Sequence, residues 1–275
     1  DLRRKAYEAW TARGANGGET DNRAIAAEIL ALRAERAALL GDILRREGIL
    51  DAPWLERIQE WRADSASRDI VGQETDELVP QYVVRQLWYA TQGDVVVVSD
   101  VGQNQMWEAQ YFIHHRRRGL LSSGGLGTMG FALPAAIGAQ MGMPDEQVWV
   151  NVGDGGFQMN IQELATVAQE KLPIKIAILN NGYLGMVRQW QQLFHGERYS
   201  EVDLSDNPDF VQVAKSFGIP GFRVERRTEV AGAIDRLLNS EGPMLAHVCI
   251  DPTTNVWPLV PPGQTNDVML EEQSA

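Results

Sequence analysis

The sequence predicts an α/β protein: a doubly wound, mostly parallel sheet with helices on both faces, preceded by a helical N-terminal segment. Three observations point to this class. Short apolar runs rich in β-branched residues recur after residue 76, each run ends in Gly, Asp or Asn, and helix-like stretches lie between the runs. Strands that are apolar on both faces and alternate with helices are typical of a parallel sheet covered on both sides.

The N-terminal part has a different composition. Residues 22–46 are rich in Ala, Leu, Glu and Arg with apolar residues at helical spacing, so one long amphipathic helix is expected there. A second, shorter helix is expected over 53–61, and the small and charged residues of 63–74 predict a linker. We therefore divide the chain into a helical segment with its linker, residues 1–75, interpreted as the end of a preceding domain, and a second domain, residues 76–275.

The apolar runs are expected to form the strands of the sheet. They are residues 94–98, 147–152, 174–179 and 244–250, together with a weaker run at 222–224. A helix is expected around 162–170, between the second and third runs. In sheets of this kind ligands bind outside the carboxyl ends of the strands, so the polar residues that follow each run are where chemistry is expected.

Composition and charge exclude several classes of function. The chain has 275 residues, with 25 Lys and Arg against 37 Asp and Glu and a net charge of −12, so its surface as a whole repels nucleic acid and anionic lipid. The apolar runs have the length of strands, and none is long enough to span a bilayer. The single cysteine, Cys249, excludes an internal disulfide and fits a reducing compartment. We expect a cytoplasmic protein that binds neither nucleic acid nor membranes.

Two polar motifs follow two consecutive apolar runs. Gly153-Asp154-Gly155 ends one run, and Asn180-Asn181-Gly182 ends the next. The 27 positions from Asp154 to Asn181 hold a turn, a helix and a returning strand, and a right-handed crossover of this size places both side chains at one edge of the sheet. A carboxylate and an amide oxygen suit Mg²⁺ that is completed by phosphate oxygens and water. The glycines let the backbone approach a diphosphate closely, and the following helix would offer it free N–H groups.

Two other interpretations of the glycine-rich segments remain open. Gly, Asn and Asp also dominate ordinary turns, so each motif taken singly could be a turn without a ligand. The segment Gly125–Gly130 matches the pattern G-x-G-x-x-G with Asp154 downstream, which could indicate a nicotinamide-dependent dehydrogenase. That match is weak, because only residues 119–121 precede it as a strand.

Five segments carry a resemblance to a known family. They are Val101–Trp107, Ser123–Gly138, Gly153–Gly155, Leu179–Trp190 and Asn207–Phe210. In this order they resemble the large catalytic subunit of acetolactate synthase, and the chain from about residue 76 is similar to its C-terminal thiamine-diphosphate-binding domain. The Gly-Asp-Gly and Asn-Asn pair is shared by all thiamine-diphosphate enzymes, including pyruvate oxidase and glyoxylate carboligase. The GLGTMG and GMVRQW segments narrow the resemblance from thiamine-diphosphate enzymes in general to acetolactate synthase.

The resemblance implies which groups hold the cofactor. Mg²⁺ would bind the side chains of Asp154 and Asn181 and the backbone carbonyl of Tyr183. The other residues expected at the cofactor are Val101, Gly102, Gln103 and Asn104 at the diphosphate, Gly155 and Gly156 beside it, and Gly127, Met129, Leu184, Gly185, Met186 and Val187 along the remainder. The family usually has His where this chain has Asn104, and an amide can still donate to phosphate although it carries no charge.

Two residues receive roles in the chemistry by similarity. Met129 would lie beneath the cofactor and hold the bend that brings its aminopyrimidine over its thiazolium; the alternative is an ordinary core methionine. Trp190 resembles the tryptophan that favours 2-oxobutanoate over pyruvate as second substrate and that lines a herbicide-binding channel. A helix residue packed against its own domain or a subunit partner is the alternative for Trp190.

The resemblance also implies the reaction and the partners. A transferase of this family would decarboxylate pyruvate and join the two-carbon unit to pyruvate or 2-oxobutanoate, which gives acetolactate or acetohydroxybutyrate for branched-chain amino-acid biosynthesis. No segment matches the domains that carry the activating glutamate and FAD, so FAD is expected outside this chain and the chain alone is expected to be inactive. A homodimer or tetramer, a small regulatory subunit and a mobile tail at 252–263 are expected. A noncatalytic cofactor-binding module is the alternative.

Overall fold

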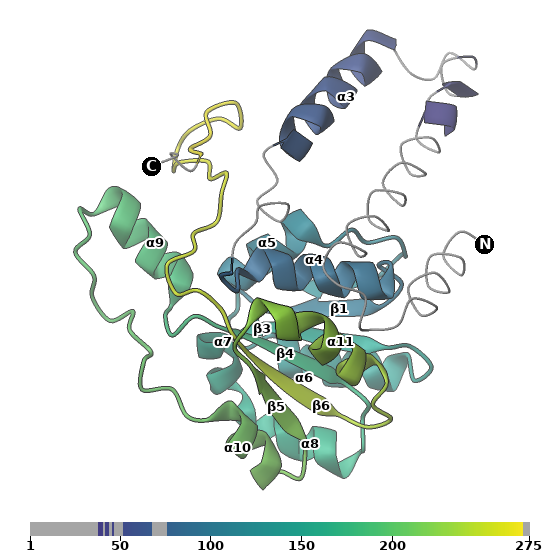
Figure 1. Ribbon diagram of the computed structural model, residues 1–275, viewed down its shortest axis with the longest axis vertical. Helices are drawn as coiled ribbons and strands as arrows, with labels where there is room; N and C mark the ends of the chain where they lie inside the picture. The colour runs from purple at the N-terminus through teal and green to yellow at the C-terminus, as the bar shows by residue number, and fades with distance from the viewer. Residues whose placement is uncertain (1–37, 41, 44–45, 47–51, 68–75, 272–275) are drawn as a thin grey trace. The chain divides into compact units, whose positions relative to one another are not determined.

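The chain consists of two compact units, Asp1–Thr75 and Asp76–Ala275. The computed structural model (Figure 1) describes residues 38–40, 42–43, 46, 52–67 and 76–271. Most of the helix expected over 22–46 therefore lies outside the described residues. In the described part of the first unit, helix α3 spans Ala52–Ser67, so the second expected helix forms but continues into the expected linker.

The sequence of α3 explains why it is longer than expected. Between Trp61 and Ser67 there is neither Gly nor Pro, so the backbone has no local reason to leave the helix. Trp54 and Trp61 share one side of α3, where their rings meet edge to face with centroids 5.6 Å apart. The guanidinium of Arg57 lies over the Trp61 ring, 5.5 Å from its centroid. Aromatic packing within the helix thus supports it locally.

The second unit is built on a six-stranded sheet in which every pair of neighbours is parallel, with the order β2-β1-β3-β4-β6-β5. The strands are β1 (Val96–Ser99), β2 (Leu120–Ser122), β3 (Val148–Gly153), β4 (Lys175–Asn180), β5 (Gly221–Val224) and β6 (Met244–Cys249). All five predicted strands form, and the short stretch at 119–121 becomes the edge strand β2. The predicted fold class is confirmed for the described residues.

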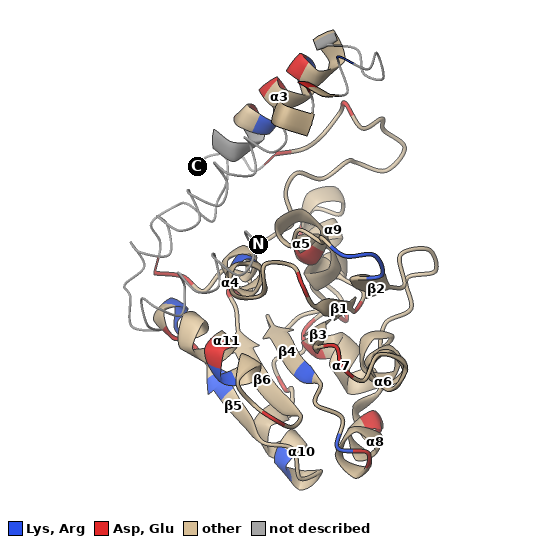
Figure 2. Cartoon of the chain, turned by 90° about the vertical axis from the view of Figure 1, so that its right-hand side faces the viewer, with Lys and Arg blue, Asp and Glu red and all other residues tan. Residues whose placement is uncertain are grey.

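Helices cover both faces of the sheet (Figures 1 and 2). They are α4 (Pro80–Thr91), α5 (Gln103–Tyr111), α6 (Ala132–Gly142), α7 (Asp154–Met159), α8 (Leu164–Gln169), α9 (Gly185–Phe194), α10 (Phe210–Ser216) and α11 (Val230–Leu238), with short 3₁₀ turns at η2 (Ile161–Glu163) and η3 (Arg227–Glu229). Helices α4, α5 and α11 pack on one face, and α6, α8 and α10 pack on the other. None of the described helices is long and apolar enough to cross a membrane.

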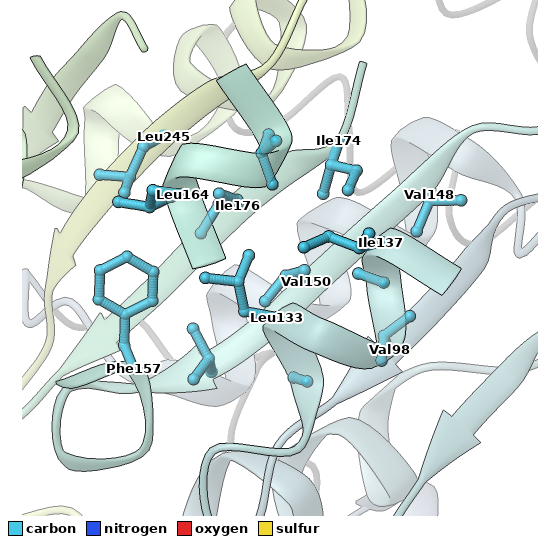
Figure 3. Close-up of a cluster of buried hydrophobic side chains, with 14 of the residues drawn as sticks. Val98, Leu133, Ile137, Val148, Val150, Phe157, Leu164, Ile174, Ile176 and Leu245 are labelled. Atoms are coloured by element: carbon cyan, nitrogen blue, oxygen red, sulfur yellow. The ribbon is translucent and has the colours of Figure 1, made fainter. Parts of the chain in front are cut away.

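A cluster of buried apolar side chains lies between the sheet and the α6, α8 and α10 layer (Figure 3). Alternate residues of the central strands point into it, among them Val148 and Val150 of β3 and Ile176 of β4, each 0% exposed. Burying a side chain of this kind stabilises a fold by about 1.5–3 kcal/mol. Because these residues lock the strands in register, they also fix where the strands end.

Candidate functional site

A cavity of about 280 Å³ lies at the carboxyl ends of β1, β3 and β4. This volume is close to the lower end of the range for small-molecule sites. All the residues predicted to contact the cofactor line it, namely Val101, Gly102, Gln103, Asn104, Gly127, Met129, Asp154, Gly155, Gly156, Asn181, Tyr183, Leu184, Gly185, Met186 and Val187. Residues spread over 87 positions of the sequence are thus brought to one place.

Strand register explains this convergence. Gly153, the last residue of β3, pairs with Leu179 of β4, so Asp154 and Asn181 leave the sheet at nearly the same level. From β1 the chain first moves outward to β2 and then returns past β1 to β3. The cavity therefore lies where the strand order reverses direction, which is where open α/β sheets bind ligands.

The carboxylate of Asp154 is almost fully buried, with 1% of the residue exposed. Its Oδ2 accepts a hydrogen bond of 2.6 Å from Nδ2 of Asn207. Burial raises the pKa of Asp154 to about 6, while the Asn207 amide and the backbone N–H groups of Asp154, Gly155 and Gly182 act in the opposite direction. Since Gly182 directly follows Asn181, the carboxylate lies against the loop that carries the predicted amide ligand. A cation at this position would favour the ionised form of the carboxylate.

The loop after β4 is held in a defined conformation by its own side chains. Asn180 Oδ1 accepts from the backbone N–H of Gly182 at 2.8 Å, and its Nδ2 donates to Nε2 of His247 at 2.7 Å. Asn181 Oδ1 accepts from the backbone N–H of Tyr183 at 3.1 Å. Among the described residues, no hydrogen bond to the carbonyl oxygen of Tyr183 is found. That carbonyl and the second lone pair of the Asn181 oxygen are therefore available to a ligand.

A hard-cation site at this loop would depend on amide and backbone oxygens. In the described part of the chain, no three His, Cys, Asp or Glu side chains gather as metal ligands. One buried carboxylate, one amide oxygen and one carbonyl form an all-oxygen set, which fits Mg²⁺ completed by phosphate and water oxygens better than it fits zinc or a soft metal. The residues present thus fit the predicted ion.

The start of α5 forms another side of the cavity. Gly102 precedes this helix with φ +131°, a conformation that L side chains rarely adopt. Gln103 and Asn104 follow it, and the first N–H groups of a helix have no partner within the helix. An anion placed here would meet these N–H groups and the positive end of the helix dipole.

The side chains of Gln103 and Asn104 have other partners. Asn104 Nδ2 donates to the carbonyl oxygens of Asp100, at 2.9 Å, and Asn151, at 3.3 Å, so both of its N–H groups are already used. Gln103 Nε2 donates to Gln189 Oε1 at 2.9 Å. The sequence predicted that the Asn104 amide could donate to phosphate. In the structure its side-chain N–H groups are already used, so the donors left for an anion are the backbone N–H groups of Gln103 and Asn104.

Asp100 was not identified by the sequence reasoning. It is 0% exposed, and its carboxylate accepts from the backbone N–H groups of Val101, at 2.8 Å, Gly130, at 3.0 Å, and Ala132, at 2.8 Å. These bonds tie the loop that carries Gly127 and Met129 to the end of β1. A Cβ atom on Gly156 would lie 2.6 Å from Asp100 Oδ1, so the glycine is required by this buried carboxylate. An acidic residue two positions after the apolar run at 94–98 was the available signal.

The structure separates the two residues that were assigned roles in the chemistry. Met129 lies half-buried at the cavity wall, with its methyl carbon 3.7 Å from where a Cβ of Gly155 would be, and it does not belong to the main apolar cluster. Trp190 is absent from the cavity and lines a neighbouring hollow of about 520 Å³ along α9. Met186 and Val187 line both spaces, so the hollow and the cavity adjoin.

The tail after β6, which was expected to be mobile, contacts α9 near its start. Gln189 of α9 exchanges two hydrogen bonds of 2.9 Å with the backbone of Val256, and Arg188 donates to Asn255 Oδ1 at 2.8 Å. Asn255 and Val256 are buried. This part of the predicted mobile segment is therefore fastened to α9, whereas residues 262–263 are exposed.

Comparison with known proteins identifies the kind of domain. Residues 100–248, more than half of the chain, match the family model "Thiamine pyrophosphate enzyme, C-terminal TPP binding domain". The chain is 48% identical over 254 residues to "Acetolactate synthase isozyme 2 large subunit" of Escherichia coli (strain K12), which covers 90% of this chain and 46% of the relative. It is 47% identical over 201 residues to "Acetolactate synthase" of Mycobacterium bovis, covering 71% of this chain and 32% of the relative.

A third relative shows a similar level of identity. "Acetolactate synthase large subunit" of Cyanidium caldarium is 42% identical over 218 residues, which cover 79% of this chain and 37% of the relative. The chain thus spans less than half the length of these curated relatives. Because the similarity to the Escherichia coli protein covers 90% of the chain, it extends into the first 75 residues.

Proposed function

The chain belongs to the thiamine pyrophosphate enzymes, as a C-terminal domain that binds this cofactor, and from this premise we propose that it forms the cofactor-binding part of an acetolactate synthase large subunit. The proposed function is the thiamine-diphosphate- and Mg²⁺-dependent decarboxylation of pyruvate, followed by transfer of the two-carbon unit to pyruvate or 2-oxobutanoate. The identities of 42–48% to acetolactate synthases favour this reaction over those of pyruvate oxidase and glyoxylate carboligase.

One observation carries the proposal: a single cavity at the strand-order reversal is lined by all the residues expected at the cofactor, and it includes a buried carboxylate. A buried carboxylate that is not neutralised by a basic side chain is costly. Mg²⁺ would offset that cost and would neutralise a diphosphate that a chain of net charge −12 otherwise repels.

Different residues would hold the metal ion, the diphosphate and the two rings of the cofactor. Asp154, Asn181 and the carbonyl of Tyr183 would bind Mg²⁺, and the N–H groups at the start of α5 would bind the diphosphate. Met129 would support the two rings in their bent arrangement from the cavity wall. When bound, thiamine diphosphate supplies the carbon centre that adds to the 2-oxoacid and stabilises the negative charge left by the departing CO₂. The contribution of these residues is binding and orientation.

Other parts of the whole enzyme are proposed by similarity. FAD and the activating glutamate would belong to segments outside this chain, so we expect no acetolactate from the purified chain alone. The words "large subunit" in the names of two relatives support a small regulatory partner, and a homodimer or tetramer is proposed with it. The alternative of a noncatalytic module makes the same prediction for cofactor binding, and it differs only in the activity of the complete protein.

Isothermal titration calorimetry on the purified 275-residue chain tests the proposal. Thiamine diphosphate should bind when Mg²⁺ is present and should bind far more weakly in EDTA. Asp154→Ala should abolish the Mg²⁺-dependent part, while Asp145→Ala, an exposed position outside the cavity, should not change it. Binding that is equal in Mg²⁺ and EDTA, or binding of NADH instead of thiamine diphosphate, would contradict the assignment.

A further inference from the structure

The segment Asn207–Phe210 carries part of the family resemblance, but the proposed function gives it no role. In the structure, Asn207 lies against Asp154: its Nδ2 donates to Asp154 Oδ2 at 2.6 Å. The other end of the same amide, Oδ1, accepts from Nε2 of Gln158. Asp154 and Gln158 are both on α7, four residues apart, whereas Asn207 comes from the segment before α10. The amide thus bridges two positions on α7.

We propose that Asn207 is a positioning residue for the metal-binding carboxylate, with its amide fixing the orientation of Asp154 so that Oδ1 stays available to Mg²⁺. This inference rests on the proposed function, because it concerns the same metal site. Neither Asn207 nor Gln158 is among the residues that line the cavity, so the effect of Asn207 must pass through Asp154.

The burial of Asp154 gives Asn207 its importance. With 1% of Asp154 exposed, water cannot replace a lost hydrogen bond. Among the described residues, Asn207 is the one side chain that hydrogen-bonds this carboxylate. An outer partner of this kind orients a metal ligand and stabilises its charged form, and loss of such partners typically weakens metal binding about 10–100-fold.

The rest of the segment holds Asn207 in reach of α7. Asp209 caps α10 by accepting from the backbone N–H groups of Val211, at 2.9 Å, and Gln212, at 3.2 Å. Phe210 is fully buried and packs edge to face on Phe157 of α7, with ring centroids 5.6 Å apart. Capping and packing therefore fix the distance between the two helices, which leaves Asn207 opposite Asp154.

The Asp154 carboxylate determines which way round the Asn207 amide sits, because an ionised carboxylate can only accept and Nδ2 of Asn207 must face it. Gln158 matches this orientation by donating to Asn207 Oδ1. In the isosteric variant Gln158→Glu, the new carboxylate can only accept. It would compete with Asp154 for the NH₂ group of Asn207. When it draws that group away, Oδ1 of Asn207 turns toward Asp154, where two acceptors repel each other.

The Gln158→Glu variant distinguishes the proposal from an effect of the added charge alone. An added negative charge on α7 should attract Mg²⁺ and tighten its binding. The proposal predicts the opposite for Gln158→Glu, because the carboxylate loses its donor. Gln162→Glu is the matched control, since it adds the same charge nearby at an exposed position that does not contact Asn207.

The test is a Mg²⁺ titration of the full 275-residue chain at fixed thiamine diphosphate, followed by tryptophan fluorescence, with Mn²⁺ electron paramagnetic resonance as a second readout. Asn207→Ala and Gln158→Glu should raise the half-saturating Mg²⁺ concentration about tenfold. Gln162→Glu should change it less than twofold, and excess Mg²⁺ should restore cofactor binding in both affected variants. Should Asn207→Ala fail to fold, the isosteric Gln158→Glu still decides the question.

The outcomes distinguish this inference from the function on which it rests. Absence of Mg²⁺-dependent binding in the unaltered chain would refute the proposed function itself. If the unaltered chain binds and Gln158→Glu binds Mg²⁺ equally or more tightly, the role of Asn207 is refuted. The same conclusion follows if the weakened binding is not restored by excess Mg²⁺, because that result indicates a collapsed cavity instead of a misoriented ligand.

Discussion

The Asp154→Asn variant is expected to be more stable than the unaltered chain at neutral pH when no metal ion is bound. Burial raises the pKa of Asp154 from 3.8 to about 6, so the folded chain binds this proton more tightly than the unfolded chain. The stabilisation that comes with the proton is complete below pH 3.8 and is lost as the pH rises through 6. At 1.36 kcal/mol for each unit of pKa, the ionised carboxylate costs about 3 kcal/mol at neutral pH.

Asparagine removes this cost without removing the hydrogen bond. Its side-chain oxygen can still accept from Asn207 Nδ2, and it does not titrate. The stability of the variant relative to the unaltered chain should therefore increase with pH, by about 2 kcal/mol between pH 4.5 and pH 7.5. Taking this difference at each pH cancels the contributions of all other titrating groups.

Urea unfolding in EDTA, followed by circular dichroism at both pH values, measures the effect. Asp145→Asn, which makes the same replacement at an exposed position outside the cavity, is the control. A difference for Asp154→Asn that is the same at both pH values would refute the reasoning, as would a variant that is less stable at pH 7.5. The expected result means that the fold tolerates a costly charge that the proposed metal binding requires.

Three further variants test other parts of the account. Burial lowers the pKa of His247 to about 4, so the folded chain resists protonation and loses stability as the pH falls from 6.5 to 4. His247→Gln keeps a hydrogen-bond acceptor but does not titrate. Its stability relative to the unaltered chain, measured by urea unfolding, should increase by about 3 kcal/mol over that range. Gly156→Ala should lower stability by about 1–3 kcal/mol because its Cβ would lie 2.6 Å from Asp100 Oδ1, whereas Gly138→Ala on α6, with open space around it, should not lower the melting temperature. Trp190→Leu in the complete enzyme should reduce the preference for 2-oxobutanoate over pyruvate by about 1–3 kcal/mol in a competition assay, and an unchanged product ratio would remove Trp190 from substrate selection.

The parts of the fold that local patterns determine could be predicted from the sequence. The runs at 147–152 and 174–179 became β3 and β4 because strands buried on both faces need continuous apolar residues. Their polar ends, Asp154 and Asn181, then line one cavity because parallel strands in register end together. Because parallel strands in register end together, the apolar pattern that predicted the strands also predicted where the site lies.

Contacts between distant segments could not be predicted in this way. Asn207 reaches Asp154 across 53 positions, and the packing of α10 on α7, which brings them together, leaves no periodic signal. The resemblance assigned Trp190 to substrate preference, and the sequence did not indicate that the direction of α9 carries it into a hollow beside the cavity. The linker was expected from residue 63, which is too early, because the residues up to Ser67 contain no helix breaker and continue α3.

The most direct test of the central claim is a crystal structure of the chain with thiamine diphosphate and Mn²⁺ in place of Mg²⁺, with the anomalous signal of manganese recorded. We predict one strong peak within about 2.3 Å of a carboxylate oxygen of Asp154, the side-chain oxygen of Asn181 and the carbonyl oxygen of Tyr183, with the remaining ligands from the diphosphate and water. A manganese peak elsewhere on the chain, or a bound cofactor whose metal does not contact Asp154, would contradict the account.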